Sequence, residues 1–135
     1  MDAMELLLTR SSGVKLGEPA PSDGDLEQML KAAVRAPDHG RLRPWRFISI
    51  RGAGREALGN LFAAATTLTN PAATPEALAR EKDKALRAPL VVLVIAKLAT
   101  QPNVKVPEIE QMLSAGAAAQ NILLAAHALG FAAVW

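Results

Sequence analysis

The sequence of 135 residues contains no cysteine, and aromatic residues make up only 4% of it. Without cysteine the chain can form no disulfide, no thiolate metal site and no thiol nucleophile, which fits a reducing compartment. The few aromatic side chains leave little surface on which nucleic-acid bases could stack. The core must therefore be built from small and aliphatic residues, among them 27 alanines.

Motifs that mark several enzyme classes are also missing. There is no G-x-S-x-G, no Walker motif and no G-x-G-x-x-G after a strand, so a serine hydrolase, a P-loop ATPase and a Rossmann fold are not indicated. The two histidines, His39 and His127, are too few for a typical metal cluster. His127 lies in an apolar helical segment, where a single histidine is typical of a hydrogen-bonded core or interface residue.

The charge is nearly balanced, with 15 basic and 13 acidic residues and a net charge of +2. This balance does not imply a polyanionic partner, although arginines gather between Arg35 and Arg55. The N-terminus carries Asp2 and Glu5 and no basic segment before its short apolar run, so it does not resemble a secretory signal. We expect a single cytoplasmic domain over residues 1–135.

The stretch from Gln111 to Trp135 has no charged residue and is long enough to cross a bilayer. It nevertheless contains Gln120, Asn121 and His127, and much of its apolar content is alanine, which contributes little transfer energy. We therefore favour a buried helix followed by a strand over a membrane role.

Periodicity and turn residues predict five helices and three strands. A helix over 1–9 precedes one that Ser22 caps, with Asp25 three residues on, and that Pro37 stops. Further helices are predicted over 55–66, over 75–87 with Thr74 as the cap, and from 107 to Gly130. Strands are predicted over 45–51, over 90–96 with both faces buried, and over 131–135. This mixture indicates a layered α+β or α/β domain.

The first candidate site is the turn Arg10-Ser11-Ser12, followed by Gly13 and Lys15. It offers a guanidinium, two hydroxyls, backbone N–H groups and an ammonium, which are the groups that hold a phosphate. A solvated surface turn has the same composition, so the pattern alone does not decide between them.

The second candidate is the loop from Arg35 to Arg46, which combines four arginines, one histidine and two prolines. Gly40 allows a close backbone approach, and the arginines could face a polyanionic or heteroaromatic ligand. A nucleic-acid patch is the weaker interpretation, because a single tryptophan and one short basic cluster give little stacking surface.

Three segments resemble the FMN-dependent NAD(P)H nitroreductase family, most closely its minimal single-domain bacterial branch. They are the helix ending in Arg10-Ser11-Ser12, the loop APDHGRLRPWRF over 36–47, and the ending SAG…GFAAVW. The likeness covers nearly the whole chain. It implies an α+β, nitroreductase-like fold, with a central, mostly antiparallel sheet flanked by helices in three α/β/α layers. It also implies a homodimer with two FMN sites at the subunit interface.

The resemblance further implies a flavin-dependent activity. NAD(P)H would pass hydride to FMN, and the flavin would then reduce a nitroaromatic or quinone-type acceptor by a ping-pong mechanism. Because the flavin carries the chemistry, no catalytic side chain is expected. The alternative is a non-catalytic dimeric flavin-binding protein, or one of different specificity such as an enone or flavin reductase.

Site residues carry over from the resemblance by position. Arg10, Ser11 and Ser12 match the turn that holds the phosphate and ribityl end of FMN, with Ser11 standing where the family has a second arginine. Arg35 and His39 match residues that reach the flavin held mainly by the other subunit.

The long helix and the end of the chain supply the other cofactor-binding residues that the resemblance implies. The stretch matching the family's nicotinamide side consists of Asn121, Ile122, Leu123, Leu124, Ala125 and Ala126. Phe131, Ala132 and Ala133 match a flavin-facing Phe-Gly-Gly, and the two alanine methyl groups narrow the backbone's approach to the ring.

The sequence departs from the family in two places. Asp38, Arg41 and Arg43 stand where the wider family usually has serine, asparagine and glutamine. Family members continue after the Val-Trp pair with an Arg-(Ser/Thr)-Gly segment, further helix and a strand, so we expect the C-terminal part of the family fold to be absent. The expected partners are a second copy of the chain and a small-molecule acceptor, with no metal, nucleic acid or membrane.

Overall fold

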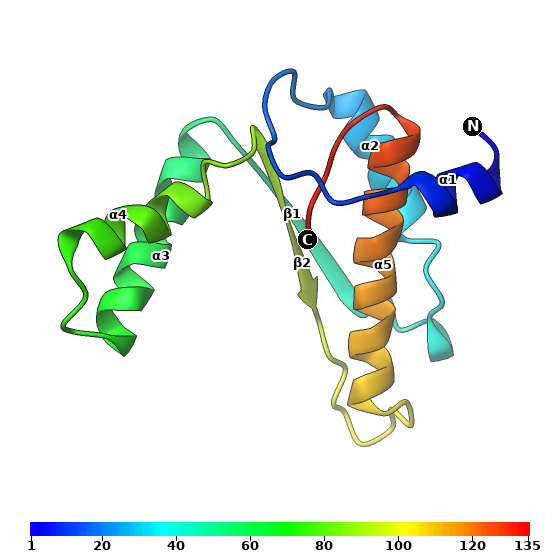
Figure 1. Ribbon diagram of the computed structural model, residues 1–135. Coiled ribbons are helices and arrows are strands. Elements are labelled where there is room, and N and C mark those ends of the chain that lie inside the picture. The colour runs from blue at the N-terminus through cyan, green and yellow to red at the C-terminus, as the bar shows by residue number, and fades with distance from the viewer. The chain divides into compact units, whose positions relative to one another are not determined.

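The computed structural model describes residues 1–135, which form two compact units. One unit comprises residues 1–14, 21–48 and 93–135, and the other comprises 15–20 and 49–92. Strands β1 (Trp45–Arg51) and β2 (Leu90–Ala96) pair in a two-stranded sheet and have the predicted bounds (Figure 1). The pairing is antiparallel, because the N–H of Lys97, just after β2, donates to the carbonyl of Pro44, just before β1. Helices combined with an antiparallel sheet confirm the α+β class.

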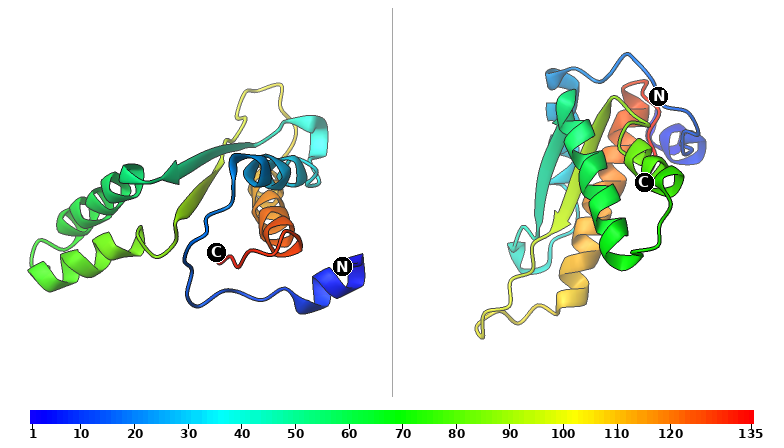
Figure 2. Two further views of the ribbon diagram at one scale, coloured as in Figure 1. Left: turned by 90° about the horizontal axis from the view of Figure 1, so that it is seen from above. Right: turned by 90° about the vertical axis from the view of Figure 1, so that its left-hand side faces the viewer.

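The core of the first unit lies between helices α2 (Asp23–Ala33) and α5 (Glu108–Ala128), which lie side by side in Figures 1 and 2. The buried positions recur every three or four residues on both helices: Leu26, Met29 and Ala33 on α2, and Gln111, Ala115, Ala118, Ile122 and Ala126 on α5. Ala33 and Ala118 are 0% exposed, so small side chains let the two helices approach closely. The amide of Asn121 donates to the Ala32 carbonyl at 3.0 Å and locks the pair.

The start of α2 has the predicted cap. The Ser22 hydroxyl accepts from the Asp25 N–H, and the Asp25 carboxylate accepts from the Ser22 N–H and hydroxyl. The helix ends at Ala33, earlier than the prediction that Pro37 stops it. The N–H groups of Arg35 and Ala36 bond three residues back, which tightens the last turn before the proline.

Helices α3 (Ala53–Thr69) and α4 (Pro75–Lys84) pack together in the second unit (Figure 2). Helix α3 extends beyond the predicted 55–66 at both ends, and the hydroxyls of Thr66, Thr67 and Thr69 in its last turn bond to carbonyls four residues back. Thr74 caps α4 as predicted, but the helix stops at Lys84 rather than near Arg87.

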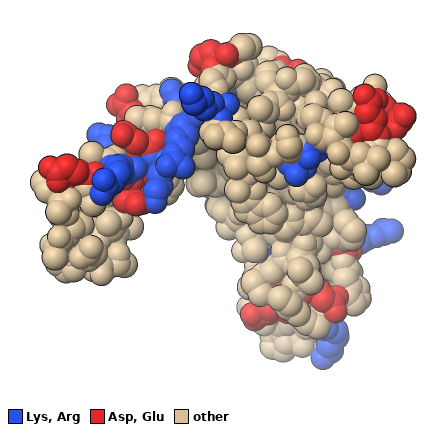
Figure 3. All heavy atoms as spheres, in the orientation of Figure 1, with Lys and Arg blue, Asp and Glu red and all other residues tan.

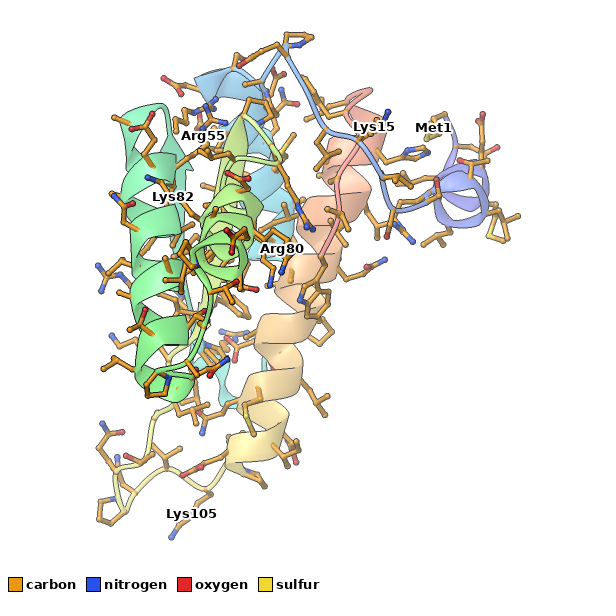
Figure 4. All side chains as sticks on the ribbon, turned by 60° about the vertical axis from the view of Figure 1, so that its left-hand side comes forward. Met1, Lys15, Arg55, Arg80, Lys82 and Lys105 are labelled. Atoms are coloured by element: carbon orange, nitrogen blue, oxygen red, sulfur yellow. The ribbon has the colours of Figure 1, made fainter.

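A close helix contact in this unit depends on a glycine. Lys82 of α4 points toward α3 in Figure 4. A methyl group added at Gly59 of α3 would lie 2.6 Å from the Lys82 carbonyl oxygen and 2.9 Å from its Cγ. Only glycine therefore fits between the two helices at this point.

Two predictions about strands are wrong. Strand β2 is half-buried rather than buried on both faces, and Ile95 is 39% exposed; with β1 as its only neighbour in the sheet, β2 also keeps one edge open. Residues 131–135 form no strand, because Ala133 alone pairs, in an isolated parallel bridge with Ser12. The uncharged stretch is the helix α5 and this segment, and no helix in the chain has the length and apolar character needed to cross a membrane.

Gly59→Ala should destabilise the fold by about 1–3 kcal/mol, because the Lys82 backbone cannot yield to the new methyl group. Gly24→Ala is the matched control: the added methyl group would meet only the Ser22 Oγ, at an ordinary 3.7 Å. Thermal and urea unfolding measure both. Equal stability of the two variants would contradict the tight contact.

The Ser22 hydroxyl, and after it the Ser22 N–H, lower the pKa of Asp25 by hydrogen bonding to the carboxylate. Because the folded pKa lies below the unfolded value, this stabilisation is present above the unfolded pKa and is lost as the pH falls through the folded pKa. Ser22→Ala should raise the pKa of Asp25 toward its ordinary value. A carboxyl titration by NMR that shows no rise would refute the capping role.

Candidate functional site

The end of helix α1 (Ala3–Thr9) is held at the C-terminal end of α5 by a side-chain hydrogen bond. The Thr9 hydroxyl donates to the Glu5 carbonyl at 2.7 Å and lies 3.1 Å from His127 Nε2. Since its one proton goes to Glu5, His127 is the donor, through Nε2–H. This confirms that His127 is a hydrogen-bonded residue, and it places the turn Arg10-Ser11-Ser12 beside the end of α5.

Helix α5 ends at Ala128, two residues before the predicted Gly130, which follows the C-cap Leu129 with a left-handed φ of +86°. The Gly130 N–H donates to the backbone carbonyl of His127, and the Phe131 N–H donates to the carbonyl of Ala126. This pair of hydrogen bonds is a Schellman motif. The motif turns the chain sharply away from the helix axis. Trp135 consequently lies back over the middle of α5, where its ring would be 3.8 Å from a methyl group at Gly116.

The reversed end of the chain meets the turn after α1. Ser12 and Ala133 form the parallel bridge, and the Gly13 N–H donates to the Ala133 carbonyl at 3.0 Å. In Figure 1 the chain after α1 passes beside the C-terminal segment. The structure thus brings together two of the sequence-predicted groups, Arg10–Ser12 and Phe131–Ala133.

The polar groups of this turn are free to bind a ligand. Arg10 is half-buried, Ser11 and Ser12 are exposed, and their side chains make no hydrogen bond or ion pair within the chain. A guanidinium and two hydroxyls without partners suit the oxygens of a phosphate. The donor set therefore fits the phosphate end of a nucleotide-like ligand.

In the stretch 121–126, which is predicted to lie on the nicotinamide side, some side chains pack in the core and others are partly exposed. Ile122 and Ala126 are buried, and the Asn121 amide is used by the Ala32 carbonyl. Leu123 and Leu124 keep part of their surface exposed, as does Ala125. Ile122 and Ala126 therefore cannot contact a ligand without opening the core.

His39 lies at the other end of α5, in the short helix η1 (His39–Arg41). The Asp38 carboxylate accepts from the N–H groups of Leu42, at 3.1 Å, and Arg43, at 2.8 Å. These bonds hold a loop in which Arg41 and Arg43 have positive φ angles of 54° and 49°, which are costly for residues with side chains. Asp38 thus organises the loop.

An open pocket of about 330 Å³ lies at this end of α5, lined by Pro37, His39, Glu110, Leu113, Ser114 and Ala117. His39 Nδ1 is 2.6 Å from Glu110 Oε2 on its rim. Arg35 follows the end of α2 and is exposed, with no side-chain partner in the chain.

The two groups of predicted site residues lie at opposite ends of one helix. Glu110 contacts His39, and His127 contacts the residue before Arg10. At 1.5 Å per residue, Glu110 and His127 are separated by about 25 Å. His39 and Arg10 of one chain therefore cannot flank the same ring system. Between these ends the surface over α5 carries few charged side chains, whereas both signs gather over α3 and α4 (Figure 3).

Sequence reasoning missed the two acidic residues that arrange the His39 loop. It treated Asp38 only as a departure from a family pattern, although an aspartate just before a Gly-containing turn is a typical acceptor for backbone N–H groups. Glu110 gave no signal, because its partner lies 71 residues away in the sequence.

The chain as a whole is similar to a known protein family. The family model for the nitroreductase family matches residues 12–135. A Haemophilus influenzae protein named as an NAD(P)H nitroreductase is 45% identical over 136 residues, covering 100% of this chain and 72% of its own length.

Solved structures agree in fold. A nitroreductase-like family protein from Bacillus cereus superimposes with a TM-score of 0.79 at 22% identity, over 100% of this chain and 69% of the other. A nitroreductase from Desulfovibrio desulfuricans, solved in complex with FMN, has a TM-score of 0.65 at 28% identity, over 93% of this chain and 62% of its own. The chain thus has the nitroreductase-like fold.

Asp38→Ala should cost about 1–2 kcal/mol of stability, because two backbone N–H groups lose their acceptor. Hydrogen exchange at the Leu42 and Arg43 amides should accelerate. Asp38→Asn keeps one acceptor oxygen, so its loss should be smaller. Unchanged exchange in Asp38→Ala would show that the carboxylate does not hold the loop.

Proposed function

Since the chain belongs to the nitroreductase family of oxidoreductases, we propose that it is an FMN-dependent NAD(P)H oxidoreductase of the cytoplasm. Its acceptors are nitroaromatic or quinone-type compounds, reduced by a ping-pong mechanism. The observation that carries the proposal is the bridge between Ser12 and Ala133, which brings together the two segments that we assign to the flavin. The chain spans 72% of the length of its Haemophilus influenzae relative.

The turn after α1 supplies the groups that would hold FMN. Arg10 binds the phosphate through its unpaired guanidinium, and the hydroxyls of Ser11 and Ser12 donate to phosphate or ribityl oxygens. Phe131, Ala132 and Ala133 would lie on the ring side of the cofactor, and the bond from the Gly13 N–H to the Ala133 carbonyl fixes the backbone there. FMN held by these residues would supply the redox chemistry between NAD(P)H and the second substrate.

The nicotinamide side is formed by the exposed part of the 121–126 stretch. Leu123, Leu124 and Ala125 offer an apolar surface that excludes water from a bound ring. Asn121, Ile122 and Ala126 act indirectly, by holding α5 against α2.

We further propose a homodimer with FMN at the subunit interface. The distance between the ends of α5 supports this arrangement, because His39 and Arg35 can reach a flavin site only if that site belongs to a second copy. Exposed apolar residues along α5 and at the chain end support it as well: Ile109, Met112, Leu113, Val134 and Trp135. Analytical ultracentrifugation with and without FMN tests the assembly.

Absorbance and kinetics separate the enzyme from a flavin carrier. Purified protein with oxidised-flavin absorbance, and parallel double-reciprocal plots for NAD(P)H against a nitroaromatic or quinone, would support the proposal. Protein that binds FMN but does not oxidise NAD(P)H would be a non-catalytic flavin-binding protein. Protein that takes up no FMN would refute both.

Arg10→Ala should weaken FMN binding by about 1–3 kcal/mol, through the loss of charge-assisted hydrogen bonds to the phosphate. Arg80→Ala is the matched control, because Arg80 lies exposed on α4 with no side-chain partner and its removal changes the net charge equally. Titration calorimetry measures both affinities. An equal loss of FMN affinity in the two variants would show that Arg10 has no specific role in binding the phosphate.

A further inference from the structure

Glu110, at the start of α5, makes the one direct side-chain bond to His39, over 2.6 Å from Oε2 to Nδ1. We infer that Glu110 is a positioning residue: it holds the His39 imidazole with Nδ1 as the donor, so that Nε2 is the ring nitrogen presented to the flavin of a second subunit. The inference deepens the proposed function and rests on it for the identity of the ligand.

The chemistry of the pair selects one tautomer. An ionised carboxylate only accepts hydrogen bonds, so Nδ1 must carry a proton whenever the contact exists. In the neutral ring Nε2 is then the acceptor, and in the charged ring it is a second donor. Without Glu110, either nitrogen could carry the single proton.

Gln111, the residue after Glu110 on α5, holds a segment that packs on the His39 loop. Gln111 is 1% exposed, accepts from the Ala99 N–H at 2.7 Å, and donates to the carbonyls of Ala99 and Val106. Val106 in turn packs on the His39 loop, since its Cγ2 would lie 3.0 Å from a methyl group at Gly40. Gln111 thus holds the segment that packs on the His39 loop, and Glu110, the residue before it, bonds to the imidazole.

The contact is not explained by the stability of the chain alone. The His39 and Glu110 side chains are 67% and 44% exposed, and an exposed ion pair contributes little to folding. The pair borders the open pocket, whose other walls include Pro37, Leu113 and Ala117. A flavin or second subunit that covers this pocket would exclude water and strengthen the bond.

The first test uses the flavin-free protein and ¹⁵N NMR of the His39 ring at a pH where the ring is neutral. The native protein should show the Nδ1–H form, whereas Glu110→Gln, whose amide can donate to Nδ1 as well as accept from Nδ1–H, should lose that selection. Glu110→Ala should show a mixture of both tautomers. Glu108→Ala is the matched control, because it removes the same charge from the same helical turn and Glu108 has no side-chain partner. A tautomer unchanged in Glu110→Ala would overturn the inference.

The second test is a double-mutant cycle on FMN affinity. Glu110→Ala should weaken binding about threefold to tenfold, and His39→Ala combined with Glu110→Ala should be no weaker than His39→Ala alone. Fully additive losses, or an equal loss in Glu108→Ala, would show that Glu110 does not act through His39. If the native protein takes up no FMN, the proposed function fails, and the NMR experiment still decides the role of Glu110.

Discussion

The packing of α2 against α5 is the constraint on which the rest of the first unit depends. Fully buried alanines on both helices and the bond from Asn121 to Ala32 place the two backbones close together. Because α5 is fixed in this way, its two ends hold other segments in place. His127 hydrogen-bonds to the end of α1, and Glu110 hydrogen-bonds to His39 in its loop. The site residues are thus arranged by a helix that is itself mostly core.

The elements of the fold that could be predicted are those with local causes. The Ser22–Asp25 box and the Thr74 cap mark helix starts, and Gly130 marks a helix end, because each signal acts within one turn of the chain. The burial of β2 and the conformation of residues 131–135 could not be predicted in this way. Both depend on which segments lie alongside them, and a short apolar run has the same sequence beside one neighbour or two.

The residues of the candidate site likewise include some that the sequence predicts and some that it does not. The resemblance indicated Arg10, Ser12 and Ala133 as site residues, and the structure brings them together through a bridge between the two ends of the chain. The partners that orient His39 could not be found from the sequence, because an exposed glutamate in the first turn of a helix has an ordinary electrostatic reason to be there. Only the fold shows that Glu110 has a histidine beside it.

The Arg10 turn and the His39 loop are both held by α5, one near each of its ends. The number of residues in α5 between these two contacts therefore cannot change without moving one group relative to the other. Each inserted residue would advance one end of α5 by about 1.5 Å and rotate it by about 100° relative to the other. The anchor at Glu110 and the anchor at His127 would then face different directions. Natural length variation among close relatives should consequently be confined to the loops, such as residues 97–107, while the register of α5 between these two anchors is retained.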